Sequence, residues 1–210
     1  MVERRKLSDK SGLTRGEART CLLDAAMMVI RERGYAASTV DDICRAAGVT
    51  KGAFFHHFAA KEELAVAATD HFAAMADGFF AAAPYRSLPR AKDRVIGYVR
   101  FRQEILSGAL AEYTCLLGTM VQEAYGTSPA IRAACEASIN AYCEALAPDI
   151  DAAIALHGIS HGVSAMSLAR HVQAVLQGAF IMAKTTDDAA IARDSVTHLK
   201  RYILMLFGRG

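Results

Sequence analysis

Residues 39–64 read TVDDICRAAGVTKGAFFHHFAAKEEL and predict two short helices joined by a tight turn, followed at once by a third helix. Thr39 supplies a hydroxyl oxygen that can cap the first helix, and Thr50 can cap the second in the same way. Gly48 stands between them, where a helix end needs a residue tolerant of positive φ. Val49 can fill the corner between the two helices. This spacing is typical of a helix-turn-helix that reads DNA.

The second helix of this pair has an apolar side and an outer side. Phe54 and Phe58 are four residues apart and are expected to face inward. The outer side is expected to carry small or polar residues, namely Lys51, Ala53 and His57. A short helix with such a face can lie in a major groove. Lys61 begins the next helix, where its ammonium group can meet a phosphate.

The surroundings of this pair narrow the assignment. An amphipathic helix precedes it and ends at the glycine of RERGY, residues 31–35. RERGY is followed by STVDDICRAAGV, TKGAFFHHF and KEEL, in that order and register. The unit resembles the DNA-binding domain of the TetR family of bacterial repressors, and the resemblance covers residues 14–65 without a gap. The chain length and the helical remainder also fit this family.

The resemblance implies roles for individual residues. By position, the family's phosphate contacts correspond to Thr39, Thr50 and Lys61. Its groove-facing positions correspond to Lys51, Gly52, Ala53 and His57. Phe55 stands where the family usually has a tyrosine whose hydroxyl reaches a phosphate, so this residue cannot make that hydrogen bond. Ala60 likewise replaces a small polar cap.

Length and charge agree with a DNA-binding head on a larger body. The expected organisation is a flexible basic arm over 1–13, a DNA-binding domain over 14–61, and an effector-binding and dimerisation domain over 62–210. Residues 1–61 carry 11 Lys/Arg and 7 Asp/Glu, whereas residues 62–210 carry 13 and 15. A basic head is the electrostatic footprint expected for phosphate binding. The arm has Arg4, Arg5 and Lys6, which either add phosphate or minor-groove contacts or have no role.

The rest of the chain shows helical periodicity and no strand-like alternation. It predicts an all-α fold of about nine helices, with the later ones near 62–80, 94–106, 115–124, 129–147, 164–184 and 189–207. Pro148 follows the helix predicted near 129–147 and allows a kink or a new helix start there. The last two helices carry a large apolar surface, formed by Val172, Val175, Leu176, Ala179, Phe180, Met182, Ile191, Val196, Leu199, Ile203, Leu206 and Phe207.

Two such helices can pack against their symmetry mates as a four-helix interface, so we expect a homodimer, and the family resemblance implies the same. An ordinary monomer core is the alternative explanation of this apolar surface. In a homodimer two recognition helices reach successive major-groove faces, so the DNA partner is expected to be a double-stranded operator with an inverted repeat.

An effector pocket is expected in the body. Apolar and aromatic side chains with a few polar tips are typical of ligand pockets, although they are also typical of cores. The candidates are Met75, Phe79, Phe101, Tyr113, Cys115, Leu116, Met120, Tyr142 and Phe180. Cys115 is expected at a helix start, where the dipole favours a thiolate, and it matches a Cys-Leu segment of family members that sense electrophiles. Lys184 matches their lysine late in the penultimate helix, so the pair is a candidate sensor; a buried inert thiol and a solvated helix end are the alternative.

Other classes of protein find little support. The start of the chain lacks a signal-peptide pattern, and no apolar run approaches the ~20 residues of a membrane span. Five cysteines without paired spacing favour free thiols in a reducing cytoplasm. We expect no cofactor and no metal, because His56 and His57 point to different sides of a helix, and His157 and His161 lie in a glycine-bearing loop.

Two alternatives to a regulator remain. Residues 158–162 match G-x-S-x-G, but the hydrolase elbow needs a strand before its serine and none is predicted. Two rivals to a regulator are kept. One is a small helical enzyme that uses Cys115 or Ser160, and the other is a helical module whose head binds protein. The sequence favours a dimeric, non-enzymatic regulator, most simply a repressor released from DNA by a small molecule, with an electrophile as one candidate.

Overall fold

A computed structural model describes residues 13–159 and 162–208. Within these residues the chain is all-α and contains no strand, which confirms the predicted fold class. The elements are α1 (Arg15–Arg33), α2 (Val40–Ala47), α3 (Lys51–His57), α4 (Lys61–Ala81), η1 (Pro84–Ser87), α5 (Ala91–Glu104), α6 (Leu110–Tyr113), α7 (Leu116–Ala124), α8 (Pro129–His157), α9 (Ala165–Thr186) and α10 (Ala189–Leu206). The described helices number ten rather than about nine, because the short α6 ends before α7 begins.

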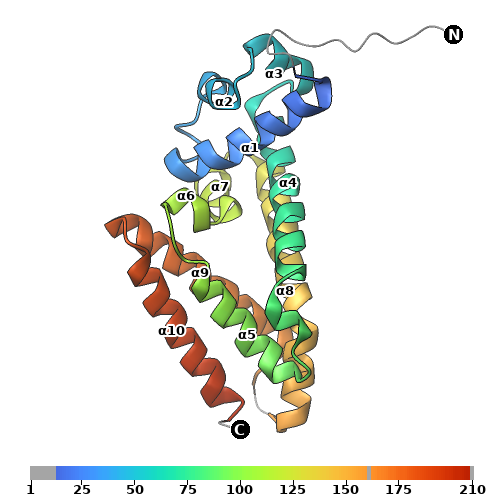
Figure 1. Cartoon of the computed structure of the whole chain (residues 1–210), viewed down its shortest axis with the longest axis vertical. Coiled ribbons are helices and arrows are strands. Elements are labelled where there is room, and N and C mark those ends of the chain that lie inside the picture. Colours follow the sequence, from blue (N-terminus) through green and yellow to red (C-terminus); the bar gives the residue numbers. More distant parts are fainter. Residues whose placement is uncertain (1–12, 160–161, 209–210) are drawn as a thin grey trace, which may run out of the picture. The chain divides into compact units, whose positions relative to one another are not determined.

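The chain divides into two compact units, and each unit combines two segments that are separated in the sequence (Figure 1). Of the described residues, the head unit comprises 13–75 and 116–136, and the body unit comprises 76–115, 137–159 and 162–208. Helices α1, α2 and α3 all lie in the head unit, and so does α7. The predicted basic arm with Arg4, Arg5 and Lys6 falls outside the described residues.

The head unit is built around α1. This helix begins at a capping box in which Thr14 Oγ1 accepts from the Glu17 N–H at 3.4 Å and Glu17 returns the contact to the Thr14 N–H at 2.7 Å. Its apolar side packs against α2, α3 and α7. The fully buried side chains of this core include Leu22, Ile30, Ile43, Phe54, Leu64, Leu116, Leu117 and Met120. Helix α7 therefore supplies part of the core that supports the helix-turn-helix.

The body unit is built around α5, α9 and α10. The last two helices lie side by side, and α10 also packs on α5 (Figure 1). Of the apolar residues that the sequence suggested for a dimer surface, only Met182 is exposed, at 49%. The others are buried or half-buried because α5, α9 and α10 pack their apolar faces on one another. The monomer core that remained as the alternative thus accounts for most of that surface.

Helix α8 runs through Pro148 as one element, so of the two alternatives left open there, a kink or a new start, the new start does not occur. One prediction about α8 needs correction, because the helix includes His157, which the sequence suggested would begin a loop. None of the described helices is long and apolar enough to cross a membrane.

Candidate functional site

Caps at the start of α2, at the end of α2 and at the start of α3 hold the helix-turn-helix. Thr39 is the N-cap of α2, and its hydroxyl oxygen accepts from the Asp42 N–H at 3.1 Å. Helix α2 ends at Gly48, whose φ of 67° lies in the left-handed region that favours glycine. Thr50 then caps α3 by accepting from the Ala53 N–H at 3.1 Å. These three predicted caps are confirmed, and together they fix the direction of α3 relative to α2.

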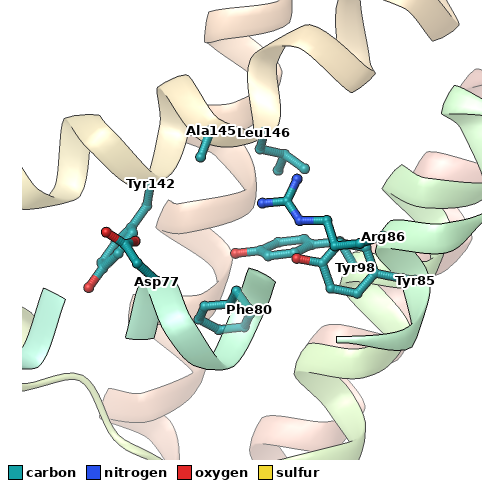
Figure 2. Close-up of a pocket in the computed structure, with 8 residues that line it drawn as sticks. All are labelled: Asp77, Phe80, Tyr85, Arg86, Tyr98, Tyr142, Ala145 and Leu146. Atoms are coloured by element: carbon teal, nitrogen blue, oxygen red, sulfur yellow. The ribbon is translucent and has the colours of Figure 1, made fainter. Parts of the chain in front are cut away.

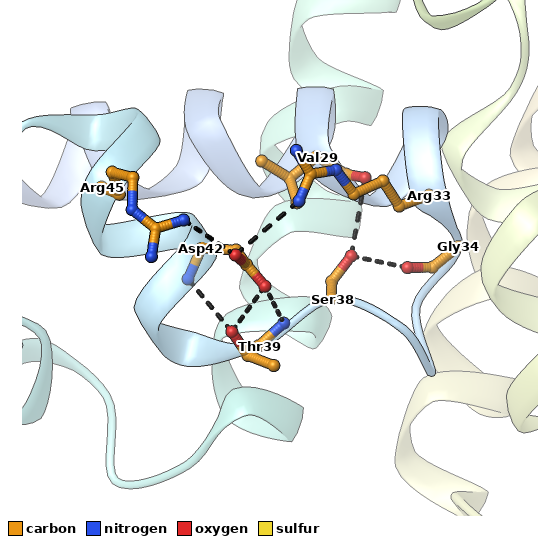
Figure 3. A network of polar contacts seen from close by, with 7 residues as sticks. All are labelled: Val29, Arg33, Gly34, Ser38, Thr39, Asp42 and Arg45. Atoms are coloured by element: carbon orange, nitrogen blue, oxygen red, sulfur yellow. Dashed lines mark hydrogen bonds and ion pairs between the residues drawn. The ribbon is translucent and has the colours of Figure 1, made fainter.

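A polar network surrounds the first cap (Figure 3). The Asp42 carboxylate accepts from the Thr39 hydroxyl at 2.6 Å and from Arg45 at 3.0 Å, and it pairs with Arg33 at 3.7 Å. The hydrogen bond from the Thr39 hydroxyl, more than the arginines, lowers the pKa of Asp42. Because Thr39 both accepts and donates within this network, its hydroxyl hydrogen is already used in the protein alone.

The outer face of α3 differs from the prediction at Ala53 and, in part, at His57. Phe54 and Phe58 are buried as expected, and Lys51, Gly52, Phe55 and His56 are exposed. Ala53 was expected on the outer face but is only 8% exposed, because the seven-residue α3 packs on both α1 and α2. His57 is half-buried, so His56 is the more accessible of the two histidines.

Lys51 is the cation of this face. Its ammonium group lies 2.8 Å from the Asp41 carboxylate of α2, and this pair raises the pKa of Lys51. Both side chains are more than half exposed, so solvent screens the pair and it contributes little to stability. Lys51 can therefore leave Asp41 for a phosphate at little cost.

Lys61 has an unexpected set of partners. Its ammonium group donates to the backbone carbonyls of Tyr35 and Ser38, each at 2.9 Å, and lies 4.3 Å from the centre of the Tyr35 ring. Burial lowers the pKa of Lys61, partly opposed by the carboxylate of Glu123. An ammonium group has three donors, so one remains for a phosphate while two hold the loop between α1 and α2.

The same loop is held from α7. The Ala36 N–H donates to the Glu123 carboxylate at 2.6 Å, and the Ser38 hydroxyl donates to the Gly34 carbonyl at 2.6 Å. Gly34 has a φ of 89° and a ψ of 160°, a conformation essentially reserved for glycine. The role of Glu123 could not be predicted from the sequence, because its partner lies 87 residues away in the chain.

Phe55 leads to a testable gain of function. The ring is 55% exposed and packs edge-on against Phe54, with 5.1 Å between the ring centres. We expect Phe55→Tyr to strengthen DNA binding about tenfold or more, since a new phosphate contact of ~1 kcal/mol would act in both heads of a dimer. Fluorescence anisotropy with a labelled duplex measures the change. Unchanged affinity would show that this position does not approach the backbone of DNA.

The body unit contains a cavity of about 50 Å³ that is partly open to solvent. Asp77 and Tyr142 lie on one side of it, Tyr85, Tyr98 and Arg86 on the opposite side, with Phe80 completing the wall (Figure 2). Ala145 and Leu146 of α8 close it from above in this view. Burial is the main cause that raises the pKa of Tyr142 and of Tyr85, so both phenols are neutral at neutral pH.

Of the pocket residues that the sequence suggested, this cavity includes only Tyr142. Met75, Leu116 and Met120 belong to the head unit, where the last two are fully buried. Phe79 is 51% exposed and rests on Phe101, with 5.2 Å between the ring centres. Tyr113 and Phe180 are ring neighbours in the body core. The other lining residues were not predicted from the sequence, and they are Asp77, Phe80, Tyr85, Arg86, Tyr98, Ala145 and Leu146.

The cysteines are thiols throughout, and none forms a disulfide. Cys115 is half-buried and stands immediately before the first residue of α7, close to the predicted helix start. Lys184 lies exposed in the last turn of α9. A sensor role for Cys115 and Lys184 stays a prediction. Among the described residues no group of His, Cys, Asp or Glu could hold a metal ion, and Ser160 and His161 of the G-x-S-x-G match fall outside them.

Comparison with known proteins places both halves of the chain. Residues 22–68 match the family model "Bacterial regulatory proteins, tetR family", and residues 91–199 match "Tetracyclin repressor-like, C-terminal domain". The HTH-type transcriptional repressor KstR2 of Rhodococcus jostii is 47% identical over 57 residues, which are 27% of this chain and 26% of that protein. CymR of Pseudomonas putida, an HTH-type transcriptional regulator, is 42% identical over 65 residues, 31% of this chain and 30% of its own. The chain thus matches less than a third of the length of these relatives.

Solved structures resemble the chain over most of its length. A TetR transcriptional regulator from Chloroflexus aurantiacus superposes with a TM-score of 0.78 and 27% identity, covering 90% of this chain and 95% of that one. The reduced form of NemR from Escherichia coli superposes with a TM-score of 0.74 at 20% identity, over 88% and 96% of the two chains, and shows a shared fold. The chain therefore belongs to the TetR family and is a DNA-binding transcriptional regulator rather than an enzyme.

Proposed function

We propose that this regulator is a homodimeric repressor that binds an inverted-repeat operator and leaves it when a small molecule binds the body. The observation that carries the proposal is the exposed face of α3, fixed by the caps at Thr39, Gly48 and Thr50, with Lys51 at its first position. Two-thirds or so of the hydrogen bonds of such complexes go to phosphate and sugar, which position a short helix on base edges.

The polar groups of the head suggest separate roles in DNA binding. The Thr50 hydroxyl oxygen accepts from the Ala53 N–H, which leaves its hydroxyl hydrogen to donate to a phosphate. The Thr39 hydroxyl can donate to a phosphate only after it gives up its hydrogen bond to the Asp42 carboxylate. Lys51 and the third donor of Lys61 supply positive charge. Gly52 and His57 remain predicted groove-facing positions, whereas Ala53 is proposed to act through the cap that it completes.

The last two helices are proposed to form the dimer interface, through different residues from those that the sequence suggested. Their outward faces expose the large apolar side chains Ile181, Met182, Tyr202 and Met205. The rings of His171 of α9 and Tyr202 of α10 lie on this surface with 5.4 Å between their centres. This contact makes the outward sides of the two helices one continuous face. A second copy that presents the same face would bury these side chains in an isologous interface.

Gly178 offers a test of this interface. It lies one helical turn before Met182, and nothing stands within 4 Å of the Cβ that a substitution would add. We expect Gly178→Arg to weaken the dimer at least tenfold, because the side chain would occupy the space of the partner copy. Gly178→Ala is the matched control, which is expected to keep the dimer and to stabilise α9 by up to about 1 kcal/mol. A concentration series by analytical ultracentrifugation measures both, and an unchanged dimer in Gly178→Arg would place the interface elsewhere.

Release requires an effector with different affinities for two states of the dimer, since only a differential affinity shifts an equilibrium. In the competent state the recognition helices match half-sites about 34–36 Å apart, or a little more. The body cavity is the proposed effector site. An electrophile that modifies Cys115 is the alternative signal that the sequence predicts.

Selection from random double-stranded DNA tests the proposed function. Full-length protein is expected to enrich an inverted repeat, and the enriched duplex is expected to compete with nonspecific DNA at physiological salt by a factor of about 10³ or more. Enrichment of a single direct site, or of no site, would contradict the proposal.

A further inference from the structure

An ion pair joins the first turn of α2 to the first residue of α3. The Lys51 ammonium lies 2.8 Å from Asp41 Oδ1 and donates to Asp41 Oδ2 at 3.1 Å. The side chains of Lys51 and Asp41 are 57% and 59% exposed. Whereas the neighbouring Asp42 is tied into the cap of α2, Asp41 holds Lys51. The pair therefore presents a donor and an acceptor side by side at the exposed face of α3.

Phosphate binding alone does not account for Asp41. Its carboxylate cancels the charge of Lys51, and it repels the phosphates that a basic head attracts. For a purely phosphate-binding role, Lys51 without this partner would be the better group. A carboxylate on a face that meets DNA is useful where it accepts a hydrogen bond from a base, and aspartate accepts from the N4 amino group of cytosine.

The edge of a G·C base pair carries the complementary arrangement. In the major groove guanine offers the acceptors O6 and N7, and cytosine offers its N4 amino group as a donor. O6 and N4 are hydrogen-bonded to each other within the base pair, so they lie about 2.9 Å apart. The Lys51 nitrogen and the Asp41 oxygen are 2.8 Å apart. The ammonium can therefore meet O6 while the carboxylate meets N4, and the ion pair does not have to open.

An A·T base pair matches the ion pair less well. It also offers one donor, adenine N6, beside one acceptor, thymine O4. The carboxylate would then lie next to N7 of adenine, which is another acceptor, and the ammonium would lie next to the methyl group of thymine. On a G·C pair the ammonium gains N7 of guanine as a second acceptor instead. The pair thus favours G·C over A·T.

The residues around the ion pair suit a close approach of DNA. Gly52 follows Lys51 on the exposed face of α3, and the nearest atom that a Cβ there would meet is Thr50 Oγ1, at 3.8 Å. Packing does not require a glycine at this position, and the missing side chain lets a base edge come near α3. Asp41 also restrains the flexible stem of Lys51, so less side-chain freedom is lost on binding.

We propose that Asp41 and Lys51 together read one G·C base pair in each half-site, with Lys51 donating to the O6 and N7 edge of guanine and Asp41 accepting from N4 of cytosine. Of the three donors of the ammonium group, one then stays on Asp41, one serves guanine, and one is left for a phosphate. The inference rests on the proposed function, in which α3 enters the major groove of an operator. It deepens that function by naming a base pair and by adding a residue of α2 to the reader.

Parallel selections from random double-stranded DNA test this reading, with the full-length wild type, Asp41→Ala and Asp70→Ala. We expect the wild type to enrich a G·C pair at one position of each half-site, and Asp41→Ala to accept other base pairs there. Asp70→Ala is the matched control, because it removes the same charge from an exposed residue of α4 in the head unit, more than two helical turns after Lys61. It is expected to enrich the same bases as the wild type.

Anisotropy titrations on the enriched duplex give the size of the effect. Replacing this G·C pair by A·T in both half-sites is expected to weaken wild-type binding about tenfold or more, and binding by Asp41→Ala less than about threefold. Inosine in place of the guanine is expected to change neither, because it keeps O6 and N7 and lacks only the amino group of the minor groove. On a scrambled duplex of the same length, Asp41→Ala is expected to bind as tightly as the wild type or more tightly, since a charge that repels phosphate is gone.

Several outcomes would overturn the base-pair reading and leave the proposed function standing. They are identical enrichment by the wild type and Asp41→Ala, an A·T pair at the position that relaxes, and a loss of wild-type binding with inosine. Weaker binding of Asp41→Ala to the enriched and scrambled duplexes alike would assign Asp41 a structural role and also overturn the reading. A wild-type protein that enriches no inverted repeat would reject the proposed function, and the base-pair reading with it.

Discussion

Gly34→Ala is expected to lower the free energy of unfolding of the head unit by roughly 2–4 kcal/mol. The φ of 89° and ψ of 160° at this residue are strained for any side chain. A Cβ at this position would also stand 2.3 Å from Glu123 Oε1. The carboxylate can swing away, but only by giving up the hydrogen bond from the Ala36 N–H. Strain and the lost hydrogen bond therefore act together.

Two other glycines separate these causes in thermal or urea unfolding. Gly48→Ala meets positive φ with nothing within 4 Å of the new Cβ, so a loss of about 1 kcal/mol is expected. Gly16→Ala lies in α1 with open space around it and is expected to be neutral or stabilising by up to ~1 kcal/mol. A loss at Gly34 no greater than that at Gly48 would show that Glu123 does not hold the loop.

Lys61→Met is expected to have two effects. Stability should fall by roughly 2–3 kcal/mol, because the carbonyls of Tyr35 and Ser38 lose a charged donor. DNA affinity should fall on all sequences alike, since the lost contact is to phosphate. A loss of ~1 kcal/mol in each head of a dimer amounts to about 30-fold.

Lys51→Met is the matched control for this second prediction. Lys51 is exposed and pairs with the exposed Asp41, so its removal should leave the stability close to that of the wild type while weakening DNA binding. Chemical unfolding and anisotropy titrations measure the two quantities in parallel. Lys61→Met with wild-type stability would contradict the loop-holding role assigned to its ammonium group.

The parts of the head that the sequence predicted correctly are local ones. The caps at Thr39 and Thr50 and the turn at Gly48 depend on residues within three positions of each other, so the local pattern carries them. The link from Glu123 to Ala36 joins positions 87 residues apart, and no spacing rule reveals it. For the same reason α7 was expected in the body, although it packs on α1.

The cavity was harder to predict than the head. Helix α4 is rich in alanine, so its apolar spacing does not decide which side faces inward, and Phe79 proved to be exposed while Phe80 lines the cavity. Tyr85 and Arg86 stand between two prolines in a segment that the sequence marked only as a break. The available signal was the tyrosine itself, because a large aromatic side chain in such a short link is buried most readily against the neighbouring core.

The proposed dimer face shows a further limit of periodicity. Apolar residues recur on α9 and α10 because α5, α9 and α10 pack together within one chain. The residues left for a partner, such as Ile181 and Tyr202, lie outside that repeated stripe. Apolar periodicity therefore does not distinguish the residues that pack within the chain from those proposed to pack on a partner copy, and the structure is needed to separate the two sets.

The most direct test of a two-headed reader is the affinity of the full-length protein for its selected inverted repeat and for the same repeat with about 5 base pairs inserted at its centre. The insertion turns one half-site by half a helical turn. We predict that it weakens binding at least 100-fold, and that log K for the intact repeat falls against log salt with a slope of about −3.6 or steeper, as four lysine contacts require. Equal affinity for the two duplexes would contradict the account.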